Sequence, residues 1–419
     1  MWVRARSLVL VASVATLVLV GASVAAVRCG NSAVPVQGAP TVLAATPSAS
    51  PPDGFFSAMV FDWTTGNVYL VSWASSNLTI INGTTGTILA NVTVGSHPVA
   101  LDVDPMSNDI FVANFGSNNV SVVSESTNRV VESVAVGTAP CAVADDPADG
   151  LVYVANFYSS FVSVIDPANW TVTSIPTAVS DDSLAVNSTT GLVYVGNYFQ
   201  LYTVMVIDID HVVGTVIPTP GNPWSMASDP ANGRLYVPLN GSGSDRVAVI
   251  DEASNVLLSN IPVGGGPRAI AVDSVNDDVY VLNLLTNNVS VISGSTDAVV
   301  ATVPTGLEPW AVAVDTSTNT VYVANLLSDN VTVISGTTNT PTASIPTGPE
   351  PSALAFDPVS GRVLVDSYGS DRVSTIASPG ANSPSSSPLS NPAVFLILGA
   401  VVVVTVAVVV VAKRVPKTK

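Results

Sequence analysis

Lysine, histidine and cysteine are scarce in this chain of 419 residues. The only histidines are His97 and His211, and the only cysteines are Cys29 and Cys141. All three lysines lie near the C-terminal end, at Lys413, Lys417 and Lys419. This composition leaves little material for Schiff-base, phosphate-binding or general-base chemistry. The chain also lacks a haem-attachment motif, a nucleophile elbow, a Walker loop and a zinc-ligand cluster, so we expect no cofactor other than a bound metal ion.

Positive charge is equally scarce in the long middle of the chain. Between residues 29 and 391, six arginines stand against 30 acidic residues, which gives a formal charge of −24. A surface this acidic repels nucleic acid and anionic lipid, so nucleic acid is excluded as a partner. Two explanations of the acidity stay open: solvation in a salty or acidic medium, and cation binding. For the cysteines, we expect Cys141 to be a buried thiol and not to bridge to Cys29.

Apolar segments at the two ends of the chain predict contact with a membrane. Arg4 and Arg6 precede an uncharged apolar stretch, so residues 1–28 are interpreted as a signal peptide or an N-terminal anchor. Residues 393–412 are 20 consecutive uncharged residues, enough for a transmembrane helix. The basic tail at 413–419 is then cytoplasmic by the positive-inside rule, and the region before the helix is extracellular. A Pro/Ser-rich stalk at 378–391 joins the two.

Sequons for N-glycosylation agree with an extracellular location. They occur at Asn77, Asn82, Asn91, Asn119, Asn169, Asn187, Asn240, Asn288 and Asn330. Three of them, Asn119, Asn288 and Asn330, occupy one position of an internal repeat, so duplication of the repeat could also account for these. We expect glycan at several of the nine.

That internal repeat is the strongest signal in the sequence. A Pro-led apolar run ends in an acidic or amide residue, and an aromatic residue follows seven positions later, with Leu364 in the last unit. The eight run-ending residues are Asp62, Asp104, Asp146, Asn187, Asp229, Asp273, Asp315 and Asp357. A period of about 40 to 45 residues made of short alternating segments is typical of a β-propeller. The fold class is therefore all-β, with four-stranded antiparallel blades over residues 53–377.

Each part of the repeat has a physical reason. The acidic residue accepts hydrogen bonds from backbone N–H groups of the turn that it begins. Glycine or Asn/Asp, such as Gly150 or Asn319, suits the position of that hairpin that needs a positive φ. Alternate Ala or Ser residues on the first strand fit between blades near the axis, where neighbouring sheets converge. The aromatic series on the second strand should fill the gap between blades as core.

The second strands also carry a family resemblance. They contain Phe-Val-Ala-Asn at 111–114, Tyr-Val-Ala-Asn at 153–156 and 322–325, Tyr-Val-Gly-Asn at 194–197 and Tyr-Val-Leu-Asn at 280–283. These segments resemble the YVTN repeats of archaeal surface-layer propeller proteins, although no unit has Thr in third place. The resemblance covers residues 53–377 and implies a cell-surface propeller; it specifies an architecture more than an activity.

Blade number depends on how the ring closes. Seven units contain four strands, but the eighth stops after 373–376. An unpaired edge strand is a liability, and propellers can borrow a strand from the other terminus. Within the leader at 29–52, residues 41–46 could supply it. We therefore predict eight blades; seven, with one unit outside the ring, is the alternative.

Two acids break the pattern of the first strands. Asp102 replaces a small residue, and Asp145 takes a position usually held by Val. If they face the central channel, they could hold Ca²⁺ through carboxylate and carbonyl oxygens. The alternative is a pair of solvated acids at the channel mouth.

A recognition surface is expected on one rim of the ring. The loops that lead into the first strands and those between second and third strands should open on the same side. They contribute Glu308 and Glu350, and they concentrate aromatic residues that suit protein or glycan contacts. These aromatics are Trp224, Trp310, Phe115, Phe157, Tyr158, Tyr198 and Phe199. Local packing of the same loops would explain each residue taken singly.

These observations predict a membrane-anchored extracellular propeller with a structural or interaction role in the cell envelope. It would bind protein or glycan partners through its rim and catalyse no reaction. The alternative is an enzyme of the lactonase or lyase type, since propellers of the resembling kind include such activities. That alternative needs His97, Arg268 and an acid to converge on one pocket at the central channel.

Overall fold

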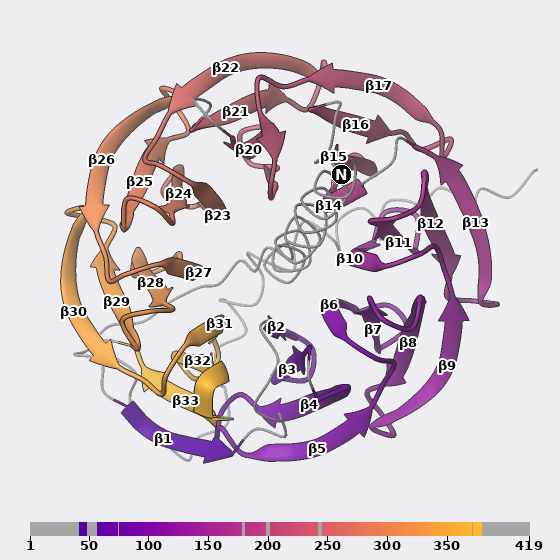
Figure 1. Ribbon diagram of the computed structural model, residues 1–419, viewed down its shortest axis with the longest axis horizontal. Helices are drawn as coiled ribbons and strands as arrows, with labels where there is room; N and C mark the ends of the chain where they lie inside the picture. Colours follow the sequence, from indigo (N-terminus) through magenta and orange to yellow (C-terminus); the bar gives the residue numbers. More distant parts are fainter. Residues whose placement is uncertain are drawn as a thin grey trace, which may run out of the picture. The chain divides into compact units, whose positions relative to one another are not determined.

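Eight small antiparallel sheets, the blades, stand next to one another in a ring around a central axis (Figure 1). The computed structural model describes residues 42–47, 57–73, 75–177, 181–197, 202–241, 245–370 and 372–378. The innermost strands of successive blades contact one another all the way round, including the last blade and the first. The prediction of an all-β propeller with eight blades is confirmed, and the seven-bladed alternative is wrong.

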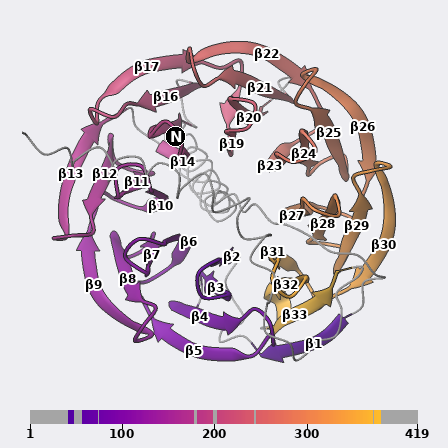
Figure 2. The ribbon, with the colours of Figure 1, turned by 180° about the vertical axis from the view of Figure 1, so that it is seen from behind.

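The blades share one plan, in which the chain runs outward from the axis (Figure 2). The innermost strands are β2 (Ser57–Phe61), β6 (Pro98–Asp104), β10 (Pro140–Asp146), β14 (Asp181–Asn187), β18 (Asn222–Pro223) with β19 (Ala227–Asp229), β23 (Pro267–Asp273), β27 (Pro309–Asp315) and β31 (Pro351–Asp357). The second strands are β3 (Asn67–Ser72), β7 (Asp109–Asn114), β11 (Leu151–Asn156), β15 (Leu192–Asn197), β20 (Arg234–Asn240), β24 (Asp278–Asn283), β28 (Thr320–Asn325) and β32 (Arg362–Ser367).

Two further strands complete each blade toward the perimeter. The third strands are β4 (Asn77–Asn82), β8 (Asn119–Ser124), β12 (Phe161–Asp166), β16 (Thr203–Ile207), β21 (Arg246–Asp251), β25 (Asn288–Ser293), β29 (Asn330–Ser335) and β33 (Arg372–Ala377). The outermost strands are β5 (Ile88–Thr93), β9 (Arg129–Ala135), β13 (Thr171–Pro176), β17 (Val213–Pro218), β22 (Val256–Pro262), β26 (Ala298–Pro304), β30 (Thr340–Pro346) and, in blade 8, β1 (Val42–Pro47). A short 3-10 helix, η2 (Tyr368–Ser370), lies between β32 and β33.

The hairpins between first and second strands form as their residues predict. In blade 3, Oδ1 of Asp146 accepts a hydrogen bond from the backbone N–H of Ala148 at 2.9 Å. Gly150, which closes the same hairpin, has a φ of 72°, and Asn319 takes its place in blade 7 with a φ of 50°. The acidic residue and the left-handed residue thus fix the turn at the inner end of each blade.

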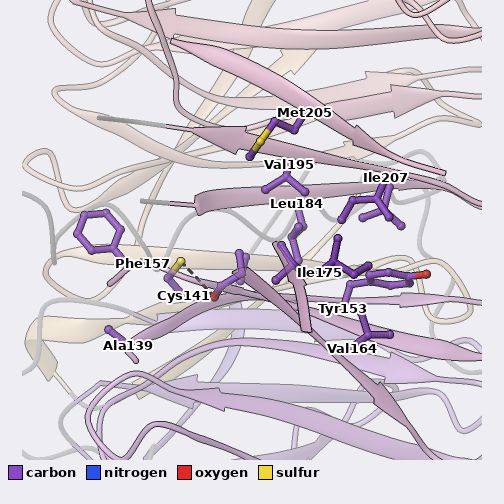
Figure 3. Packing of buried hydrophobic residues seen from close by; sticks show 14 residues of the cluster. Ala139, Cys141, Tyr153, Phe157, Val164, Ile175, Leu184, Val195, Met205 and Ile207 are labelled. Carbon is purple, nitrogen blue, oxygen red and sulfur yellow. Dashed lines mark hydrogen bonds between the residues drawn. The ribbon is translucent and has the colours of Figure 1, made fainter. Parts of the chain in front are cut away.

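The core lies between the blades. Figure 3 shows the interface of blades 3 and 4, where Tyr153 of β11 belongs to the same apolar cluster as Leu184 of β14 and Ile207 of β16. Cys141 is buried in this interface, and its thiol donates to the carbonyl oxygen of Ala155 at 3.5 Å. The aromatic series on the second strands is fully buried, as predicted for core residues. Cys29 lies outside the described residues, so its pairing stays a prediction.

A strand from the start of the chain closes the ring. β1 pairs with β33 in antiparallel register, from Val42 opposite Ile376 to Pro47 opposite Arg372. The prediction of a closing strand near residues 41–46 is therefore confirmed. A side-chain hydrogen bond also joins blades 1 and 8, where the ring closes: Oγ of Ser57 in blade 1 donates to Oδ2 of Asp366 in blade 8 at 2.6 Å.

The predicted membrane segments lie outside the described residues. Residues 1–28, all of the predicted stalk at 378–391 except Ser378, the helix at 393–412 and the tail at 413–419 belong to this group, whereas Ser378 is buried in the propeller. Among the residues that the structure does describe, no helix is long and apolar enough to span a membrane.

Closure by β1 can be tested with proline, which has no N–H to donate to a strand ladder. Successive residues of an antiparallel strand point their N–H groups alternately toward and away from the partner strand. The double substitution Ala44→Pro/Ala45→Pro therefore removes one β1–β33 bond whichever way β1 faces. We expect it to lower the free energy of unfolding by about 1–3 kcal/mol, measured by urea denaturation.

The matched control is Val172→Pro/Thr173→Pro in β13, an outermost strand that closes no seam. Because only the β1 variant loosens the contact between the two ends of the chain, it should also broaden the unfolding transition or split it in two. Equal losses and equally sharp transitions in both variants would contradict a special role for β1.

Candidate functional site

The loop rim is held in place by the buried asparagine that ends each typical second strand. In blade 3, the side-chain amide of Asn156 donates to Oγ of Ser163 and to the carbonyl oxygen of Phe161, each at 3.0 Å. The same Ser163 Oγ accepts from the backbone N–H of Gly137, in the loop that leads into the blade, at 3.2 Å. A Cβ on Gly137 would lie 2.5 Å from Cγ of Asn156, so only glycine fits. Asn114 and Asn325 make equivalent bonds.

A second set of hydrogen bonds joins neighbouring blades at the rim. Glu308 has a left-handed φ of 52°, and its N–H donates to Oδ1 of Asn287 in the preceding blade at 2.8 Å. Its carbonyl oxygen accepts from the N–H of Leu326, which follows β28, at 2.9 Å. The loop into the first strand and the loop after the second strand therefore lie together on one side of the ring. The predicted rim exists as a structural unit.

The rim aromatics differ in exposure according to their position. Phe157, four residues after the core aromatic of β11, is buried, whereas the next residue, Tyr158, is 51% exposed. Their rings meet edge to face with centroids 4.9 Å apart. Phe115, at the same repeat position as Phe157, is half-buried. Tyr198 and Phe199 lie outside the described residues, so their placement stays a prediction.

Trp73 is a rim residue that the sequence prediction omitted. It lies four residues after Tyr69, the position that Phe115 and Phe157 hold in blades 2 and 3. Its indole stacks on the imidazole of His97 with centroids 4.4 Å apart and an interplanar angle of 16°. The spacing from the core aromatic could have identified it, but blade 1 lacks the Asn that marks the motif elsewhere.

Trp224 and Trp310 are buried and not displayed on the surface, which limits their predicted binding role. The guanidinium carbon of Arg268 lies 3.4 Å from the ring centroid of Trp310 and 5.6 Å from that of Trp224. Cation–π stacking of this kind explains how an arginine that is 4% exposed is stabilised. Arg268 and Trp310 are the second residues of β23 and β27 in blades 6 and 7, and Trp224 directly follows β18 in blade 5. They therefore pack together across the interfaces of blades 5 with 6 and 6 with 7.

No contact between His97 and Arg268 is seen among the described residues. Trp73 stacks on His97, and it also packs against Trp310, whose ring covers Arg268. The imidazole and the guanidinium thus contact different indole rings. The convergence that the enzymatic alternative requires is not seen among the described residues.

Exposed leucines form part of the rim that sequence patterns did not reveal. Leu285 and Leu327 hold the same repeat position as Tyr158 and are 73% and 55% exposed. Leu307, also exposed, is joined to Leu327 by a backbone hydrogen bond of 3.2 Å. Glu308 lies beside Leu307, and Glu350 is its counterpart in the next blade; both are half-buried.

The two out-of-pattern acids, Asp102 and Asp145, lie together at the opposite end of the first strands from the rim. They line a cavity of about 390 Å³ between the innermost strands of blades 2 to 6. Oδ2 of Asp102 accepts a hydrogen bond from the backbone N–H of Asp145 at 3.0 Å, and Oδ1 accepts from the N–H of Val103 at 2.9 Å. Asp145 is only 8% exposed, and its buried Oδ1 has no hydrogen-bond partner among the described residues.

Burial shifts both carboxyl groups toward the neutral form. It raises the pKa of Asp145 to about 8, and the negative charges of Asp104, Asp102, Asp146 and Asp149 add to the rise. Burial also raises the pKa of Asp102, to about 6, although its two N–H donors act in the opposite direction. At neutral pH the pair therefore holds about one negative charge. No third acid, His or Cys joins them as a metal-ligand group in the part of the chain that the structure describes.

The predicted glycosylation sites fall into two groups. Asn187 is buried and its amide donates to Oε2 of Glu252 at 2.7 Å, so the folded structure has no room for a glycan there. Asn119 and Asn330 accept bonds from the buried Asn114 and Asn325, a structural reason for their recurrence. All sequons other than Asn187, including Asn119 and Asn330 as well as Asn77, Asn82, Asn91, Asn169, Asn240 and Asn288, are at least partly exposed.

Comparisons with known proteins identify the fold but no family. No protein-family model matches the chain, and no curated protein matches it. Among solved structures the chain is similar to "Kuenenia stuttgartiensis Hydrazine Synthase", with a TM-score of 0.58 and 20% sequence identity over 72% of this chain and 98% of that one. At this identity the likeness supports the propeller fold alone. The resemblance to YVTN repeat proteins stays a prediction.

The pKa of Asp145 predicts how stability depends on pH. Between about pH 4 and pH 8 the folded protein keeps a proton on Asp145 that the unfolded chain has lost, so this group lowers stability as pH rises. Asp145→Asn removes that loss. Chemical denaturation gives the free energy of unfolding of the variant and of the native protein at each pH. We expect the variant's advantage to be at least about 1 kcal/mol larger at pH 8.5 than at pH 5.0. Asp210→Asn, at an exposed turn, is the control and should show no such difference.

Proposed function

We propose that this protein is a membrane-anchored propeller that is displayed outside the cell and binds another envelope protein through its loop rim, without catalysing a reaction. The observation that carries the proposal is the exposed apolar position of the rim. Blades 3, 6 and 7 place Tyr158, Leu285 and Leu327 there, largely in solvent. The fold needs no side chain at this position, because blades 2 and 8 have Gly116 and Gly369. Apolar groups that the fold does not require are typical of interaction surfaces.

A protein partner fits this rim better than a glycan. Glycans are held by flat aromatic faces and by dense hydrogen-bond donors, whereas Leu285, Leu307 and Leu327 offer only aliphatic surface. Tyr158, with its edge-to-face support from Phe157, is a rigid anchor of the kind found at the centre of protein interfaces. The acidic composition of the chain would then favour a partner with a basic surface around its apolar centre.

The location rests on the sequence at the two ends. The uncharged segment at 393–412, the basic tail after it and the exposed sequons together favour display on the outer side of a membrane. The resemblance to surface-layer propellers favours the same location. The ring contacts of His97 and Arg268, which involve Trp73 and Trp310 and no shared acid, give no support to the lactonase or lyase alternative.

The rim can be tested by photo-crosslinking in the native cells. A benzophenone amino acid replaces Leu327 on the rim or Val359, which is 60% exposed in the hairpin at the opposite face of blade 8. We expect one discrete protein adduct from position 327 and none from position 359. Adding Leu285→Ser and Leu307→Ser should reduce the adduct at least tenfold, because loss of an apolar anchor weakens an interface by more than about 1 kcal/mol.

Adducts of equal yield from both positions would contradict binding through the rim, and adducts that carry glycan without protein would replace the protein partner by a glycan. Hydrolysis of a lactone panel by the purified protein, abolished by His97→Ala, would overturn the non-enzymatic proposal.

The membrane topology has its own test. An epitope placed after Lys419 should be protected from protease on intact cells and digested after permeabilisation, because the positive-inside rule places Lys413 and the residues that follow it in the cytoplasm. An epitope inserted next to Asn169, in the exposed turn of blade 3, should be accessible in both cases. Digestion of the C-terminal epitope on intact cells would contradict the proposed anchor.

A further inference from the structure

The cavity that contains Asp102 and Asp145 has the size and the walls of a small-molecule site. Its volume of about 390 Å³ falls within the range of ligand pockets, and its wall comes from the innermost strands of five successive blades. Most of the lining residues have aliphatic side chains, including Leu101, Val143 and Met226, and polar main-chain and carboxyl atoms are exposed between them. Only four of the described lining residues have a side-chain oxygen: Asp102, Asp145, Ser188 and Ser228.

The fold does not account for the two acids. At the repeat position of Asp102 the other blades have Val60, Ala144, Ala185, Ala227, Ala271, Ala313 and Ala355. At the repeat position of Asp145 the other blades have Phe61, Val103, Val186, Ser228, Val272, Val314 and Phe356. Six of the eight blades thus form without an acid at either position, and blades 2 and 3 each have one. The two departures occur in adjacent blades and face the same cavity, which makes chance drift a poor explanation.

Burying these groups is unfavourable without a ligand. A buried carboxyl group with an oxygen that lacks a hydrogen-bond or charge partner destabilises the folded state, and more strongly when the group is ionised. Among the residues that the structure describes, Oδ1 of Asp145 has no such partner, and its side chain is more than nine-tenths buried. Among the described residues that line the cavity there is no Arg, Lys or His. The neighbouring acids Asp104, Asp146 and Asp149 add only negative charge. A cation from outside the chain would complete the site.

We propose that this cavity binds a small organic cation, a protonated amine attached to an apolar body. The ammonium group would donate hydrogen bonds to the carboxylates of Asp102 and Asp145, and the apolar body would lie against the aliphatic wall. The carboxylates stand on one side of the cavity, in blades 2 and 3, so they orient the ligand with its apolar part toward blades 4 to 6.

A metal ion suits this cavity less well. Ca²⁺ takes six to eight oxygen ligands, and the two carboxyl groups have only four oxygens between them, so main-chain carbonyls or waters would have to provide the rest. An ammonium group needs only two or three acceptors, and its attached carbon chain gains from the apolar surface that a metal ion would leave unused. The original expectation of Ca²⁺ is therefore replaced by an amine as the favoured ligand, and Ca²⁺ becomes an outcome of the test.

The test is calorimetric titration of the purified full-length chain with ethyl-, butyl- and hexylammonium chloride, with 1-hexanol as the neutral analogue and with CaCl₂. We expect hexylammonium to bind at least tenfold more tightly than hexanol. Affinity should rise by about fourfold for each added CH₂ group, as burial of the chain in an apolar cavity predicts. Asp145→Asn and Asp102→Asn should each weaken hexylammonium binding at least tenfold.

Asp210→Asn is the matched control, since it makes the same change of charge at an exposed turn and should bind as the native protein does. All variants are measured in one buffer, so any uptake of the probes by detergent is common to all. A thermal unfolding curve for each variant shows that it is folded.

Three outcomes would overturn the proposal. Equal affinity for hexylammonium and hexanol would show that the acids take no part. Affinity independent of chain length would indicate surface ion pairing. Binding of Ca²⁺ that is lost in Asp145→Asn, with no binding of the amines, would assign the cavity to a metal ion.

Discussion

Every blade of this protein depends on its neighbours, because a four-stranded sheet buries its two faces only against the sheets on either side. The apolar clusters accordingly lie between blades and not within them. Polar bonds cross the seams as well: the hydroxyl of Tyr69 donates to Glu125 at 2.7 Å, and that of Tyr280 donates to Asn319 at 2.9 Å. A ring is the arrangement in which no face is left without a partner. Pairing of β1 with β33 completes it.

Much of this fold could be predicted from single residues whose roles are local. Asp146 accepts from the backbone two residues on, and Gly150 takes a positive φ, wherever the chain makes that hairpin. These requirements recur in every blade, so the residues that meet them recur at a regular spacing in the sequence. The closing strand could also be predicted, because the eighth unit lacks a fourth strand and an apolar segment precedes the first unit. The spacing did not show what the Asn of the motif does: it binds a third-strand hydroxyl and fixes a loop.

The candidate sites were harder to predict because they depend on neighbouring blades. Phe157 and Tyr158 are adjacent aromatics in one loop, yet only the second reaches solvent. Trp310 looks like a surface anchor until Arg268 of the preceding blade is seen to stack on it. Asp102 and Asp145 were detectable as departures from the repeat, but their shared cavity follows from the ring. Departures from a repeat therefore mark positions to examine, and three-dimensional contacts decide between packing and binding.

The closing strand has a consequence for how the chain reaches its folded state. β1 leaves the ribosome first, whereas its partner β33 emerges some 330 residues later. Until translation is almost complete, every partial product is an open arc with an uncovered blade face at its growing end. Contacts this distant in sequence form slowly, and open strand edges favour aggregation. For such a ring, passage through a membrane in an unfolded state before closure would be an advantage, since no stable structure exists to obstruct it.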